Sequence, residues 1–165
     1  QVVIPLWPVP ITGQTLAVLL VGSALGALRG TLSMVLYAVL GIVGLPVFSG
    51  ADSGITVILG PTGGYIVGFV FAAAFTGWIA QRSWDRKIFR SVLGFLGGTV
   101  VTFAIGLPWL ALSLGLNLEQ TLVAGLYPFI IGGVVKMVIA ASVMTLGWSY
   151  LEREDRRRAD RELAV

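Results

Sequence analysis

Long apolar runs separated by short connections make up most of this chain. The pattern predicts helices at 14–28, 31–48, 62–82, 88–108 and 127–150, followed by a basic tail at 151–165. A helix that crosses a bilayer needs about 20 apolar residues, and the last three segments are long enough. The first two are short and flank Arg29 and Gly30, so they predict a helical hairpin with a tight turn. Residues 1–13 contain three prolines and predict an extended loop.

The composition supports a membrane protein. Hydrophobic residues make up 56% of the chain and charged residues only 12%, whereas soluble domains carry roughly 25% charged residues. We therefore predict an all-α integral membrane protein with a single transmembrane domain over residues 1–165. Cysteine and histidine are absent, which excludes disulfides, zinc sites and Cys-His or Ser-His catalytic pairs. We expect no enzyme activity, no metal, no cofactor and no nucleic-acid partner.

The basic residues predict the orientation in the membrane. Four lie in 82–90 and five in the tail, whereas the connections at 1–13, 45–63 and 108–127 contain no Lys or Arg. Basic loops stay in the cytoplasm, so we expect those three connections outside and the C-terminus inside. Aromatic residues would then mark the outer interface at Trp7, Trp109 and Tyr127, and the inner one at Trp78, Trp84, Trp148 and Tyr150.

The segment Gly60–Tyr65, GPTGGY, is rich in glycine and lies in a predicted outer connection. It lacks the Lys-Ser/Thr pair of a phosphate-binding loop, and ATP is not available outside the cell. Two interpretations remain open. Gly64 and Gly68 have the spacing of a close helix–helix contact. Alternatively, the glycines let the backbone pass close over a small ligand.

Lys136 is the one charged residue deep within a predicted span. If the last helix begins at Pro128, Lys136 lies about 12 Å from its outer end. A charge at that depth costs about 2.5–3.5 kcal/mol and usually faces a functional cavity. By helical spacing, Lys136 shares a face with Phe129, Gly132, Gly133 and Ala140. This face predicts one wall of a pocket for an anionic, partly apolar ligand.

Four motifs together resemble the BioY family, the biotin-specific substrate-binding components of energy-coupling-factor (ECF) transporters. They are Pro8–Leu20 (PVPITGQTLAVLL), Gly44–Gly50 (GLPVFSG), Gly60–Tyr65 (GPTGGY), and Pro128–Gly132 (PFIIG) with Lys136. Their order and spacing match along nearly the whole chain.

The resemblance implies a bundle of six transmembrane helices in a prokaryotic cell membrane, with the first helix missing before Gln1. It further implies an outward-facing pocket roofed by loops, in which biotin binds without chemical change. The implied partners are one transmembrane coupling protein and two ATPase subunits. Members of the family usually carry an Asp at the position of Gly133, and that Asp contacts the ligand.

The candidate ligand-binding residues follow from the residue chemistry and from the family resemblance together. Biotin has a carboxylate, a ureido ring and an apolar body, so Lys136 would serve as the cation, either for the carboxylate or for the ureido oxygen. Asp52 would accept the ureido N–H groups. Gln14 and Tyr65 would add an amide and a hydroxyl, and Phe48 and Phe129 apolar cover. The set is completed by Thr62, Gly63, Gly64 and Gly133. The main alternative is a substrate-binding component for a different water-soluble vitamin.

Overall fold

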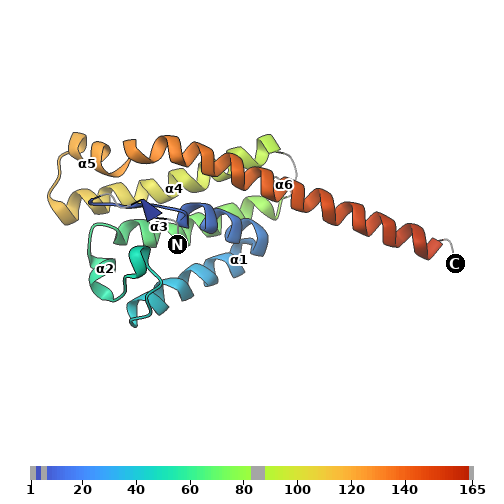
Figure 1. Cartoon of the computed structure of the whole chain (residues 1–165), viewed down its shortest axis with the longest axis horizontal. Helices are drawn as coiled ribbons and strands as arrows, with labels where there is room; N and C mark the ends of the chain where they lie inside the picture. The colour runs from blue at the N-terminus through green and yellow to red at the C-terminus, as the bar shows by residue number, and fades with distance from the viewer. Residues whose placement is uncertain (1–2, 5–6, 83–87, 164–165) are drawn as a thin grey trace.

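The computed structural model describes residues 3–4, 7–82 and 88–163, and it is almost entirely helical (Figure 1). Its elements in chain order are β1 (Val3–Ile4), β2 (Ile11–Thr12), α1 (Gln14–Ile42), the 3-10 turn η1 (Ser49–Ala51), α2 (Ile55–Leu59), α3 (Gly63–Ala80), α4 (Ile88–Leu114), α5 (Leu118–Gly125) and α6 (Tyr127–Leu163). The predicted inner connection at 83–87, with Trp84, Arg86 and Lys87, lies outside the described residues.

Helix α1 is a hairpin of two packed halves. Its backbone breaks at Gly26, where φ is 77° and ψ is 175°, a conformation that only glycine adopts readily. A Cβ on Gly30 would lie 2.9 Å from the Cα of Gly22, so the two halves touch through glycine backbone. The turn falls three residues before the predicted Arg29–Gly30, and the second half ends at Ile42 rather than at 48.

The centre of the bundle is the packing of α3 against α1 on one side and α4 on the other (Figure 1). Small residues allow this close approach. A Cβ on Gly68 of α3 would lie 2.9 Å from the carbonyl oxygen of Thr102 in α4. Val18, Phe69, Ala72 and Ala73 form a buried cluster between α1 and α3. Small residues at such contacts are typical of helices that pack within a bilayer.

Three helices of the described residues are long and apolar enough to cross a membrane, namely Gln14–Ile42, Gly63–Ala80 and Arg90–Leu114. A fourth candidate consists of Leu118–Ile130 and Gly132–Gly147, which are bent by 40° relative to each other. The 18 residues of α3 span about 27 Å at 1.5 Å per residue, close to the thickness of the hydrocarbon core, about 30 Å.

The connections contain more structure than the apolar pattern predicted. Residues 1–13 include a short antiparallel pairing of Val3–Ile4 with Ile11–Thr12. Helix α5 lies within the predicted 108–127 connection and begins with a capping box between Asn117 and Gln120. Helix α6 continues through the predicted tail to Leu163 and extends beyond the rest of the bundle (Figure 1).

Candidate ligand-binding site

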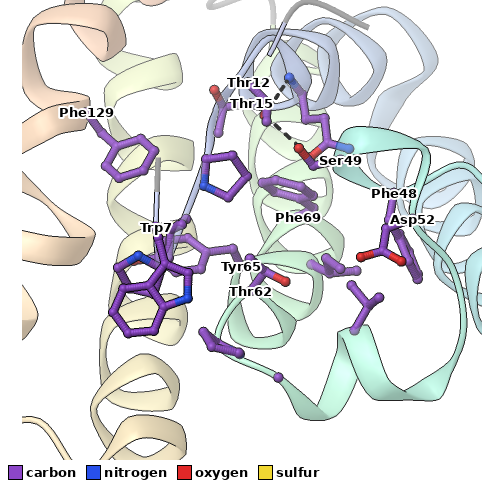
Figure 2. A pocket seen from close by; sticks show the side chains of 18 of the residues that line it. Trp7, Thr12, Thr15, Phe48, Ser49, Asp52, Thr62, Tyr65, Phe69 and Phe129 are labelled. Atoms are coloured by element: carbon purple, nitrogen blue, oxygen red, sulfur yellow. Dashed lines mark hydrogen bonds between the residues drawn. The ribbon is translucent and has the colours of Figure 1, made fainter. Parts of the chain in front are cut away.

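A cavity of about 380 Å³ lies at the end of the bundle that carries α2 (Figure 2). Its volume falls in the usual range for small-molecule sites, about 300–1,000 Å³. It is enclosed by the N-terminal segment, by the connection between α1 and α3, and by side chains from α3, α4 and α6. The lining residues are Trp7, Pro8, Val9, Pro10, Thr12, Gln14, Thr15, Phe48, Ser49, Asp52, Thr56, Val57, Gly60, Pro61, Thr62, Tyr65, Ile66, Phe69, Phe103, Phe129 and Lys136.

Lys136 reaches this cavity from α6. Its ammonium group donates hydrogen bonds to the carbonyl oxygen of Thr12 and, at 3.4 Å, to the hydroxyl of Thr15. The side chain is half-buried. Both hydrogen-bond partners found for it in the described part of the chain are neutral oxygens. A cation held in this way can still gain from an anionic or strongly polar atom of a ligand.

Gln14 is held at the first turn of α1. Its amide nitrogen donates a hydrogen bond of 2.8 Å to the hydroxyl of Tyr37, in the second half of the hairpin. The ring of Tyr37 meets the ring of Phe48 edge to face, with 5.5 Å between the centroids. Phe48 is only 1% exposed. The α1 hairpin therefore positions both Gln14 and Phe48, which line the cavity.

Asp52 lies on the side of the cavity formed by residues 48–52. Its carbonyl oxygen accepts a hydrogen bond of 3.1 Å from the backbone N–H of Phe48, which closes the turn. Its carboxylate accepts one of 2.9 Å from the backbone N–H of Ser53. The residue is exposed. Figure 2 shows Asp52 beside Phe48, across the cavity from Phe129 and Trp7.

An aromatic wall forms the apolar side of the cavity. The rings of Tyr65 and Phe103 lie 5.7 Å apart, and those of Phe103 and Phe129 lie 5.9 Å apart, both in edge-to-face arrangements. The hydroxyl of Tyr65 donates a hydrogen bond of 3.0 Å to the carbonyl of Gly125. Tyr65 therefore contributes its ring to this wall, whereas its hydroxyl ties α3 to the end of α5.

Seven of the predicted site residues line this one cavity, namely Gln14, Phe48, Asp52, Thr62, Tyr65, Phe129 and Lys136. They come from four separate parts of the chain, so the fold brings them together.

Gly63, Gly64 and Gly133 do not line the cavity. A Cβ on Gly63 would lie 3.0 Å from the Cα of Ile58, and one on Gly64 would lie 2.6 Å from Cγ of Trp109. Of the two interpretations of the glycine-rich segment, close packing therefore accounts for these two positions. Gly133 instead lines a second, almost wholly apolar groove between α4 and α6.

Several lining residues were not predicted individually. Thr12 and Thr15 lie within the PVPITGQTLAVLL motif, and their polarity in an apolar segment was a usable signal. Phe69 and Phe103 gave no such signal, because an aromatic residue inside a span can equally face lipid. Trp7, expected in the outer aromatic belt, lines the cavity while 83% exposed.

The comparisons with known proteins agree on one family. Residues 1–153 match the model of the BioY family. The biotin transporter BioY of Rhizobium etli is 39% identical over 141 residues, covering 81% of this chain and 75% of that protein. The probable biotin transporter BioY of Pyrococcus horikoshii is 39% identical over 143 residues, which cover 87% of this chain and 83% of that protein. The crystal structure of the S-component for biotin from an ECF-type ABC transporter is similar, with a TM-score of 0.80 and 27% identity over 88% of this chain and 79% of that one.

Proposed function

Because this chain belongs to the BioY family of multi-pass membrane transporters, we propose that it binds biotin from the outer side of the membrane and mediates its uptake. It would do so as the substrate-binding component of an ECF-type transporter. The observation that carries the proposal is the cavity in which Lys136, Gln14 and Asp52 meet an aromatic wall. Relatives with 33–39% identity are named biotin transporters.

The chemistry of the cavity fits the chemistry of biotin. The ligand has an apolar body, which the rings of Tyr65, Phe103 and Phe129 would cover. Its carboxylate and ureido oxygen need donors, and Lys136 supplies a charged one. Its ureido N–H groups need acceptors, and the carboxylate of Asp52 accepts only. A mostly apolar pocket with a few placed polar groups is the usual design for such ligands.

This chain would catalyse no chemical step, since biotin would be bound, moved and released unchanged. Residues 1–165 would act as one transmembrane unit in a prokaryotic cell membrane, with the C-terminus in the cytoplasm. ATP hydrolysis would take place in two ATPase subunits, and a transmembrane coupling protein would join them to this chain. The similar structure is the S-component for biotin from an ECF-type ABC transporter, which supports this assembly.

Equilibrium binding to the detergent-solubilised chain tests the function. Biotin should bind saturably with one site per chain, whereas thiamine and riboflavin should not compete with it. Saturable binding of one of those vitamins without binding of biotin would replace this proposal with the alternative vitamin specificity.

A further inference from the structure

The hydroxyl of Ser49 is a buried polar group with no hydrogen-bond partner among the residues that the structure describes. Ser49 begins the 3-10 turn η1 and lines the cavity. A buried hydroxyl without a partner is costly, and in native proteins such a group usually has a reason. Among the described residues, Thr145 also has a buried hydroxyl without a hydrogen-bond partner, but it does not line the cavity.

The turn around Ser49 is held firmly in place. On one side Phe48 is buried, with its ring against Gly41 and Tyr37. The backbone N–H of Ala51 donates a hydrogen bond of 3.1 Å to the carbonyl of Phe48. The backbone of Ser49 is therefore held in place by the fold, beside the cavity that its side chain lines.

The same turn contains an uncommon backbone conformation. Gly50 has a φ of 76° and Ala51 a φ of 62°. Positive φ is uncommon for a residue other than glycine, and such positions gather at ligand sites. Here the left-handed pair lets Ser49 and Asp52, three residues apart, both line the cavity. The strain and the unpartnered hydroxyl thus lie on one short segment that faces the ligand space.

We propose that the Ser49 hydroxyl donates a hydrogen bond to a carbonyl-type oxygen of the bound ligand and so helps to select it. This assignment rests on the proposed function, since it takes biotin as the ligand. Biotin carries such an oxygen on its ureido ring and two on its carboxylate. The negative charge of Asp52 on the same turn favours the uncharged ureido oxygen, because a carboxylate placed there would be repelled.

The test compares Ser49→Ala and Ser49→Thr with the parent, all as the purified full chain in detergent, by calorimetric titration with biotin. The loss of one neutral hydrogen bond should weaken binding about threefold to tenfold in Ser49→Ala. Ser49→Thr keeps the hydroxyl and should recover part of that loss. Ser53→Ala is the matched control, since it removes a hydroxyl from the same connection at a position that does not line the cavity.

A structural role of Ser49 would give a different result. In that case Ser49→Ala would lower the thermal midpoint of the ligand-free protein, and Ser49→Thr would not restore binding, which would overturn the inference. Parent-like affinity in Ser49→Ala would also overturn it while leaving the proposed function intact. If the parent protein itself did not bind biotin, that result would contradict the proposed function, and with it the role of Ser49.

Biotin methyl ester then identifies the oxygen that Ser49 contacts. If the ratio between the affinities of Ser49→Ala and the parent is the same for the ester as for biotin, the hydroxyl contacts the ureido oxygen. If the ratio moves toward one with the ester, whose uncharged carbonyl oxygen is a weaker acceptor than a carboxylate, the contact is to the carboxylate. Either result supports the hydrogen bond itself.

Discussion

At the scale of single residues, Lys136 is a charged group on the wall of the cavity. The residue is half-buried in α6, and its ammonium group donates hydrogen bonds to the Thr12 carbonyl and the Thr15 hydroxyl. These neutral partners compensate part of the cost of placing a charge there. A polar or anionic atom of the ligand would compensate more, because hydrogen bonds between charged groups are stronger than those with neutral partners.

Lys136→Met should weaken biotin binding about tenfold to a hundredfold. Methionine keeps the length and apolar character of the side chain but removes the charge. A hydrogen bond to a charged group contributes about 1.5–3 kcal/mol, and each 1.4 kcal/mol is a factor of ten in affinity. Calorimetric titration of the purified variant measures this change.

The matched control for that prediction is Arg29→Met, which removes a positive charge from an exposed position outside the cavity. It should bind biotin as the parent does. The thermal midpoint of ligand-free Lys136→Met should be no lower than that of the parent, because the variant no longer carries a charge in the membrane. Unchanged affinity in Lys136→Met would remove Lys136 from the site.

The residues that could be predicted were those whose chemistry contrasts with their surroundings. Lys136 was conspicuous because charge is rare inside a span, and Asp52 because acids are rare in the predicted outer connections. Phe103 also lines the cavity, yet it lies in a stretch of α4, residues 100–107, that is apolar apart from Thr102. Only the packing of α3, α4 and α6 distinguishes it from a lipid-facing residue.

At the scale of helices, the contact between α3 and α4 depends on positions without side chains. Gly64 lies at the start of α3 against Trp109, whose indole N–H donates a hydrogen bond of 3.1 Å to the carbonyl of Gly60. The glycine-rich segment is thereby fixed to α4. Gly63 and Gly64 do not line the cavity themselves, but the other four residues of the segment do, namely Gly60, Pro61, Thr62 and Tyr65.

Gly64→Ala should destabilise the protein by about 1–3 kcal/mol, since overpacking forces well-packed helices to shift. The new methyl group would lie 2.6 Å from Cγ of Trp109 and 3.1 Å from the carbonyl oxygen of Ile105. Thermal unfolding without ligand measures the loss. Gly132→Ala is the control, since a Cβ there meets nothing within 4 Å. A Gly64→Ala variant with parent-like stability and weaker biotin binding would favour the ligand-cover interpretation instead.

Tyr65→Phe tests the hydrogen bond that joins α3 to the end of α5. The variant keeps the aromatic wall but removes the hydroxyl that donates to the carbonyl of Gly125. We expect a stability loss of about 0.5–1.5 kcal/mol with little change in biotin affinity, because the ring remains. Tyr127→Phe is the control at an exposed tyrosine. If Tyr65→Phe instead lost affinity at unchanged stability, the hydroxyl would be a ligand contact.

Helix breaks were harder to predict than helices. The apolar pattern predicted a turn at Arg29–Gly30 because a charge and a glycine stand together there, but the chain turns at Gly26. Gly22, Gly26 and Gly30 are equally spaced, and each could in principle turn the backbone. The contact of Gly22 with Gly30 requires the turn midway between them. That requirement is tertiary and cannot be recognised from the local sequence.

At the scale of the whole molecule, the two ends of the bundle differ in charge as well as in shape. The cavity end includes α2, α5 and the connections without Lys or Arg. The opposite end includes the α1 turn beside Arg29, the end of α3 at Arg82 and the start of α4 at Arg90 (Figure 1). The guanidinium of Arg82 stacks 3.6 Å from the ring centroid of Trp78, a pairing that suits a membrane interface. This charge asymmetry is the basis for expecting an outward-facing cavity.

Single cysteines can test that orientation, because the native chain contains none. Ser49 is a poor reporter, since its hydroxyl is buried. Leu118, 76% exposed at the start of α5, and Gln81, exposed at the end of α3, are better positions. On intact cells a membrane-impermeant thiol reagent should label Leu118→Cys, whereas Gln81→Cys should react only after the cells are opened, as the positive-inside rule requires. The reverse pattern would place the cavity in the cytoplasm, and an uptake carrier that captures biotin from outside could not have that orientation.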